Sequence, residues 1–321
     1  KREEWEGEGA AAESPGEAHA EPPATDAQDM IAASLMAQFD AATEARDLSK
    51  PARRQKDAVA DGTEDESMRF KKVMYGEASA AMLKAEALKD SMEGIVREDW
   101  SKASLLLRLF KGARPKLRTA ELRIQRDCLM ALAKVPMSSA VMHERVLFSC
   151  YRALTGESTC PPRIGPHWEV IGFQGNDPAT DLRGVGMLAL LQVLHFKLKR
   201  PQLLQDIYTL SRKDEQDFPF MAVSIGMTAL ALQALRAGVL TSQCNRSKQA
   251  YDTVHNFYQA CYLYMSVEWK RRSLTILNFG DLKNEIQKLS LKKPTMLMQR
   301  LSRHGSPPKN SSQPKDMVEF E

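Results

Sequence analysis

The region 247–272 restricts the fold more than any other part of the chain. Large side chains recur in it every three or four residues, as they do on one face of an α-helix. They are Tyr251, Val254, Tyr258, Cys261, Tyr262, Met265 and Trp269. Such a stripe is typical of a helix buried in a core. No region alternates apolar and polar residues for long enough to predict a sheet, so the sequence predicts an all-α fold.

Further helices are predicted from composition and spacing. The regions concerned are 70–109, 117–134, 139–154, 182–198, 217–237 and 281–289. The region 70–109 is rich in helix-forming residues and contains no proline, so it predicts one long helix. The nearly uncharged region 218–235 approaches the length of a membrane span. Because Pro219 and Gly226 interrupt it and Arg236 follows, we expect a buried core helix instead.

The two ends of the chain differ in composition from its middle. Residues 1–66 are acidic and have few large apolar side chains, which predicts disorder, and residues 304–321 predict a short disordered tail. The remainder is basic although the net charge is only +4, so its partner is expected to be negatively charged. Five widely spaced cysteines without a C-x-x-C pair predict neither disulfides nor a zinc site, and favour a cytoplasmic protein.

Several catalytic motifs are absent from the sequence. There is no G-x-x-x-x-G-K-[ST] phosphate loop, no H-E-x-x-H and no G-x-S-x-G. The glycine pair Gly184 and Gly186 is followed by Ala189 where a dinucleotide fingerprint needs a third glycine, and no strand precedes it. We therefore expect no cofactor, no metal and no nucleotide-hydrolysis site within the chain itself.

The region 168–186 mixes polar, small and aromatic residues at a density that a plain core does not need. An Asp-Pro and a Thr-Asp pair, at 177–178 and 180–181, are both helix-start signals, and Thr180 is one candidate N-cap. Arg183 then lies in the first turns of a helix, where a cation is disfavoured by about 0.3–1 kcal/mol. Contacts outside the helix must explain this arginine.

Two explanations for Arg183 remain open from the residues alone. In the structural one, Arg183 pairs with Asp177 or Glu169, while Gly184 and Gly186 allow close helix packing. In the functional one, Arg183 is presented to a phosphate, and the small residues let the backbone of another protein come close.

The same region resembles the ELMO domain family, and most closely its single-domain members. The shared pattern is Trp, three residues, Gly-Phe-Gln, three residues, then Pro-x-Thr-Asp-Leu-Arg-Gly-x-Gly and spaced leucines. It is carried by Trp168, Gly172, Phe173, Gln174, Pro178, Thr180, Asp181, Leu182, Arg183, Gly184, Gly186 and Leu190. One departure is Val193, where the resemblance implies leucine. It implies an ELMO domain over 119–303, preceded by a helical extension over 67–118.

The resemblance implies a function. Single-domain members resemble GTPase-activating proteins for Arf and Arf-like GTPases, and their activity is thought to need the arginine at the place of Arg183. The implied partner is an Arf-family GTPase in its GTP-bound form, with Arg183 as the catalytic residue. Partner-binding or loop-supporting roles are implied for Trp168, Gln174, Asp177, Thr180, Asp181, Gly184 and Gly186.

The sequence is also compatible with two other functions. The larger ELMO proteins resemble this domain but act as partners of a Rac exchange factor, so a non-catalytic scaffold is the alternative to an activator. The basic regions 108–126 and 270–272 favour transient, peripheral contact with an anionic membrane surface. No nucleic acid is expected as a partner.

Overall fold

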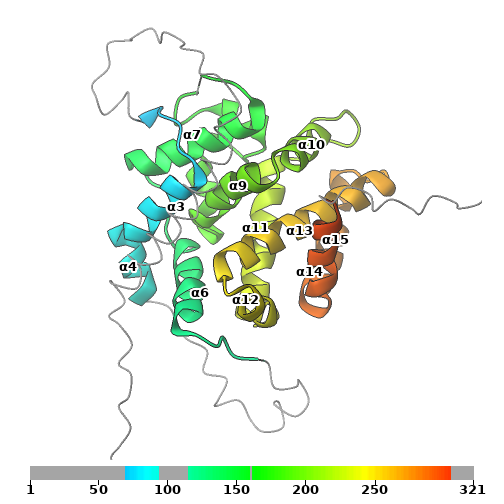
Figure 1. The fold of residues 1–321 in the computed structure, drawn as a ribbon. Helices are drawn as coiled ribbons and strands as arrows, with labels where there is room; N and C mark the ends of the chain where they lie inside the picture. Colours follow the sequence, from blue (N-terminus) through cyan, green and yellow to red (C-terminus); the bar gives the residue numbers. More distant parts are fainter. Residues whose placement is uncertain (1–68, 94–114, 160, 305–321) are drawn as a thin grey trace, which may run out of the picture.

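The computed structural model describes residues 69–93, 115–159 and 161–304 (Figure 1). Its helices are α3 (Tyr75–Lys84), α4 (Glu86–Glu93), α6 (Ala120–Leu132), α7 (Val141–Thr155), η2 (Pro166–Ile171), α8 (Pro178–Asp181), η3 (Leu182–Gly184), α9 (Leu188–Lys199), α10 (Pro201–Ser211), α11 (Phe220–Arg236), α12 (Thr241–Ser247), α13 (Ala250–Arg271), η4 (Ile276–Asn278), α14 (Phe279–Lys292) and α15 (Pro294–His304). No strand occurs in these ranges, so the all-α prediction is confirmed. The predicted disordered ends lie outside the described residues, apart from His304, which is the last residue of α15.

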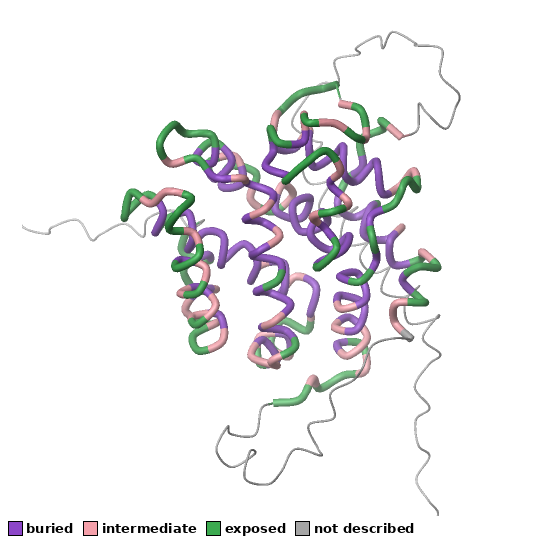
Figure 2. The backbone as a smooth tube through the Cα atoms, turned by 180° about the vertical axis from the view of Figure 1, so that it is seen from behind, coloured by how far each residue is buried: buried purple, intermediate pink, exposed green. Residues whose placement is uncertain are grey.

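Helix α13 occupies the centre of the molecule (Figure 1). It contacts α6, α9, α10, α11, α12, α14 and α15. Every member of the predicted stripe, from Tyr251 to Trp269, is buried. Figure 2 shows that the buried residues lie in the middle of the molecule and that the exposed residues lie mainly in the turns at both ends. The stripe is therefore the core of the domain, as its spacing predicted.

Helix α11 is the apolar segment that raised the question of a membrane span. Most of its residues are buried, and it packs against α9, α13 and α14. In the described ranges no single helix is long and apolar enough to cross a membrane. Only α11 together with α12, a pair bent by 87°, has the required length and composition.

The long helix predicted over 70–109 is wrong within the described residues. The chain breaks at Ala85, whose backbone is extended, and separates α3 from α4. The break lets α3 pack on α7 and α9 while α4 packs on α6. Leu83 and Leu88 are fully buried as a result. Tertiary burial on two different surfaces thus overrides local helix propensity.

Three α-helices among the described residues were not predicted at all, namely α10, α12 and α15. Helices α10 and α15 both begin with proline in the first turn, a position where the missing N–H costs nothing. Pro201 and Pro294 were therefore usable start signals, followed by apolar residues at helical spacing. Helix α12 has only seven residues and no such pattern.

A buried polar cluster ties α3, α9 and α13 together. The rings of His195 and His255 stack with centroids 4.5 Å apart. Nε2 of His195 lies 3.4 Å from Oδ1 of Asp252, and the amide of Gln259 donates to Nδ1 of His195 at 2.9 Å. The hydroxyl of Tyr75 lies 2.9 Å from Nε2 of His255. These bonds satisfy His195 as a neutral ring.

This cluster predicts acid sensitivity. Burial lowers the pKa of His195 and His255, while the His195 hydrogen bond holds the pKa of Asp252 at about 2. Lys199 and Arg200 also oppose a charged His195. Below about pH 6.5 these two histidines bind protons in the unfolded chain but stay neutral in the folded chain. The free energy of unfolding therefore has its full value above that pH. It falls by up to about 1.4 kcal/mol per pH unit for each histidine as the pH drops.

Urea unfolding at a series of pH values measures this slope. Replacing one ring, as in His255→Gln, is expected to flatten it by about half relative to the unchanged chain. A free energy of unfolding that stays constant between neutral pH and about pH 5 would contradict the assignment of neutral, buried rings.

Candidate functional site

The region 161–187 lies at the end of the molecule where α6 finishes and α11 begins (Figure 1). Trp168 anchors it from inside. Its ring is fully buried, stacks on Phe148 at 5.9 Å and meets Tyr151 edge-on at 5.7 Å. The indole N–H donates to the carbonyl of Arg163 at 3.0 Å. Trp168 therefore supports the loop and is not available to a partner.

Asp177 fixes the start of the short helix α8. Its Oδ1 accepts from the backbone N–H of Ala179 at 2.9 Å and from Nη1 of Arg163 at 2.7 Å. Partial burial opposes ionisation, but these two donors and the charges of Arg163 and Arg183 outweigh it and lower the pKa of Asp177. Asp177 is thus the N-cap, and the candidate cap Thr180 is not.

Asp181 holds the exposed part of the loop. Its Oδ2 accepts from the backbone N–H of Gln174 at 2.5 Å, and the hydroxyl of Thr180 donates to the carbonyl of Asp177 at 2.8 Å. Gln174 and Thr180 are both exposed. The four polar residues suggested by the sequence therefore form one hydrogen-bonded unit, in which the two aspartates position the backbone.

Gly172 and Gly186 permit contacts that a side chain would block. Gly172 has φ +89°, and a Cβ there would stand 2.2 Å from the backbone nitrogen of Phe220. Gly186 has φ +54°, and a Cβ there would stand 2.6 Å from the carbonyl oxygens of Leu132 and Val135. These glycines let the loop close onto α11 and α6.

Gly184 differs from these glycines because the structure gives it no packing role. It is exposed, and a Cβ added there would meet no atom within 4 Å. Its φ is not in the left-handed region. Within the described residues nothing therefore requires glycine at this position, next to Arg183.

Arg183 sits in η3 with an exposed side chain. No hydrogen bond or ion pair joins Arg183 to another described residue. Asp177 forms its ion pair with Arg163 instead, and Glu169 forms no ion pair with Arg183. The helix predicted over 182–198 begins only at Leu188, as α9, because the chain turns through η3 at Arg183. Arg183 is thus presented on a tight turn and not on a long helix.

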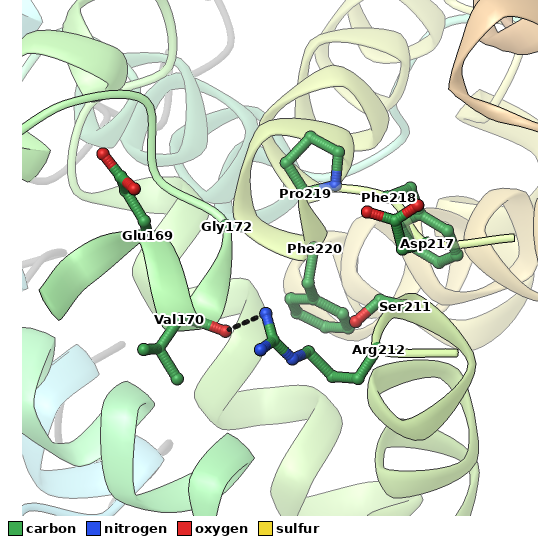
Figure 3. Close-up of a pocket in the computed structure, with 9 residues that line it drawn as sticks. All are labelled: Glu169, Val170, Gly172, Ser211, Arg212, Asp217, Phe218, Pro219 and Phe220. Carbon is green, nitrogen blue, oxygen red and sulfur yellow. Dashed lines mark hydrogen bonds between the residues drawn. The ribbon is translucent and has the colours of Figure 1, made fainter. Parts of the chain in front are cut away.

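A recess of about 170 Å³ opens beside this loop, between η2 and the α10–α11 turn (Figure 3). Val170 and Phe218 form apolar parts of its wall, and the carboxylates of Glu169 and Asp217 lie on either side of it. Arg212 crosses the recess and donates to the carbonyl of Val170 at 3.3 Å. The surface near the loop is therefore concave and combines apolar and charged side chains.

Sequence reasoning missed two residues that build this site. Arg163 pairs with Asp177 across 14 positions, and no local signal connects them. Arg212 reaches Val170 from α10, a helix that was not predicted. An arginine several residues from an aspartate in the sequence is too common to identify an ion pair from one sequence.

The described residues hold no group of three or more His, Cys, Asp or Glu side chains that could bind a metal ion. Cys128, Cys150, Cys244 and Cys261 are all buried and unpaired in disulfides. Burial raises the pKa of each of these thiols. None of them is therefore suited to act as a nucleophile.

The Trp168–Gly186 loop lies in a part of the chain that matches a known class of domain. Residues 127–283 match the model of the ELMO/CED-12 family, so this part of the chain is a domain of that family. The matched range starts within α6 and ends within α14, so it includes the loop and α13. No solved structure matches the chain.

Among curated proteins, the chain is similar to human ELMO domain-containing protein 3. The two are 38% identical over 198 residues, which is 61% of this chain and 52% of the human protein. Mouse ELMO domain-containing protein 2 is 30% identical over 132 residues, or 40% of this chain and 45% of that protein. Mouse ELMO domain-containing protein 1 is 26% identical over 171 residues, or 47% and 52%. The chain spans about half the length of these relatives.

Proposed function

We propose that this protein activates GTP hydrolysis by an Arf or Arf-like GTPase, and that Arg183 reaches the GTP phosphates. The observation that carries the proposal is the exposed guanidinium of Arg183, which makes no hydrogen bond or ion pair within the described residues. The ELMO family membership agrees with a role in small-GTPase regulation.

The loop around Arg183 has the properties that such a role needs. An arginine donated in trans works by positioning, so the backbone that carries it must be rigid. Asp177 and Asp181 fix that backbone, and Trp168 and Gly186 anchor it to the core. The partner therefore meets a preformed loop, and only the Arg183 side chain has to be ordered on binding.

Gly184 provides a second, independent argument for the same proposal. An added methyl group at this position would meet no atom of the described residues within 4 Å, and no backbone strain requires glycine. A glycine next to an exposed arginine does, however, leave room for the backbone of a partner to approach. Gln174 and Thr180 expose polar groups at the edge of the same surface.

The chemistry is that of charge stabilisation. As the γ-phosphoryl group transfers to water, negative charge spreads over its oxygens and the leaving oxygen. The planar guanidinium can donate two parallel hydrogen bonds to these oxygens and stays charged throughout. The GTPase supplies the nucleotide site and the attacking water, so the present chain needs no phosphate loop of its own.

The test is GTP hydrolysis by a panel of purified Arf and Arf-like GTPases with trace amounts of this protein. We expect one or more of them to be accelerated at a molar ratio well below one, since an activator turns over. Acceleration only at a stoichiometric ratio, or binding without acceleration, would instead identify the scaffold function that larger ELMO proteins suggest.

A further inference from the structure

One end of the helical domain is strongly basic. It is formed by the segments 115–121, 236–249 and 288–295, which we call the basic end. These segments contain eight exposed basic residues, namely Lys116, Arg118, Arg236, Arg246, Lys248, Lys288, Lys292 and Lys293. Their one acidic residue is Glu121. The charge is thus concentrated in segments far apart in the sequence.

Hydrogen bonds hold the three segments side by side. The side chain of Asn245 accepts from the N–H of Arg118 and donates to the carbonyl of Lys116, both at 2.9 Å. Gln243 donates to the hydroxyl of Thr295 at 3.0 Å. In Figure 1 the chain before α6 runs beneath α12, and α14 ends beside it. The basic end is therefore a built surface.

The charges of the basic end are not neutralised. None of its eight basic side chains forms an ion pair with another described residue. The basic run 270–272 behaves differently, because Arg271 and Arg272 pair with Glu268, and Arg272 also pairs with Glu285. Of the two basic regions suggested by the sequence, this one is largely compensated.

We propose that the basic end binds the surface of an anionic lipid bilayer. Each lysine or arginine near such a surface adds favourable electrostatic energy, and eight unpaired cations on one end sum their contributions. None of the three segments contains an aromatic residue on which bases could stack, so single-stranded nucleic acid fits this surface poorly.

Binding at the basic end orients the molecule. Helices α6 and α11 both span the distance between the basic end and the Arg183 loop, in opposite directions: Gly186 packs against the last turn of α6, and the N–H of Ala222 in the first turn of α11 donates to the carbonyl of Gly172. At 1.5 Å per residue, the 17 residues of α11 span roughly 25 Å. A bilayer on the basic end therefore leaves the Arg183 loop facing away from the membrane.

The test is co-sedimentation of the full chain with phosphatidylcholine vesicles, with and without phosphatidylserine, at low and raised salt. We expect binding only to the anionic vesicles, and loss of binding at raised salt. The quadruple variant Arg246→Glu, Lys248→Glu, Lys292→Glu, Lys293→Glu is expected to bind at least about 100-fold more weakly. The matched control Lys71→Glu, Lys72→Glu, Lys213→Glu, Lys270→Glu has the same net charge and exposed sites elsewhere, and it should keep most of the binding.

Other results would overturn the proposal. They are equal loss of binding in the two variants, equal binding to neutral vesicles, no binding at low salt, or tighter binding to an RNA oligonucleotide or to free inositol phosphate than to the vesicles. Thermal melting of both variants checks that each is folded. Since vesicles replace the GTPase here, the result is independent of whether the protein activates hydrolysis.

Discussion

Replacing Arg183 by alanine is expected to abolish the acceleration of GTP hydrolysis while leaving the protein fully folded. An arginine supplied in trans contributes about 10³–10⁵-fold to the rate, or about 4–7 kcal/mol of barrier. Arg183→Lys should lose most of this effect as well, because an ammonium group cannot place two donors in one plane. Single-turnover hydrolysis with a responding Arf-family GTPase measures the loss.

The structure makes this a clean experiment. Because Arg183 forms no hydrogen bond or ion pair with the described residues, its removal should change the melting temperature little. Arg303→Ala is a matched control, since Arg303 is also exposed and forms no hydrogen bond or ion pair with the described residues, but lies in the last turn of α15. Full activity in Arg183→Ala, or equal losses in both variants, would show that another group performs the reaction.

The core of the fold was predictable because burial leaves a period in the sequence. The stripe from Tyr251 to Trp269 identified α13, and the uncharged region 218–235 identified α11 as a core helix. Local signals were also sufficient for the end of α7, where Gly156 adopts a left-handed conformation after the last turn.

Other parts of the fold depend on tertiary packing, which one sequence does not reveal. The break at Ala85 exists because α3 and α4 cover different helices, although their residues favour one continuous helix. The delayed start of α9 has a similar origin. Val185 and Gly186 continue the turn so that Gly186 can approach α6, at the cost of regular helix from Leu182 onward.

The candidate site was located by its residue types, but its internal arrangement was not. Asp177 and Glu169 were equally reasonable partners for Arg183 from the sequence. The structure gives Asp177 to Arg163 and leaves Arg183 without either partner. Whether Arg183 pairs within the protein or is free to meet a phosphate thus depends on the contact between Arg163 and Asp177, which are 14 residues apart in the sequence. The phosphate-directed role of Arg183 itself stays a prediction.

Gly172 and Gly186 supply the second large expected effect, this time on stability. Gly172→Ala and Gly186→Ala should each destabilise the domain by about 3 kcal/mol or more, since a left-handed backbone and an overlap with neighbouring backbone each cost about 1–3 kcal/mol. For a domain of this size that is roughly 10 °C in the melting temperature. Many domains have only about 5–15 kcal/mol in total.

Gly184→Ala is the matched control within the same loop. Its added methyl group meets no atom within 4 Å and its φ needs no glycine, so stability should change by less than about 1 kcal/mol. Thermal or urea unfolding of the three variants gives the comparison. If Gly184→Ala were as destabilising as Gly186→Ala, the loop would have a different conformation from the one described. If it melts normally yet activates hydrolysis poorly, the methyl group is acting on a partner, because it contacts none of the described residues.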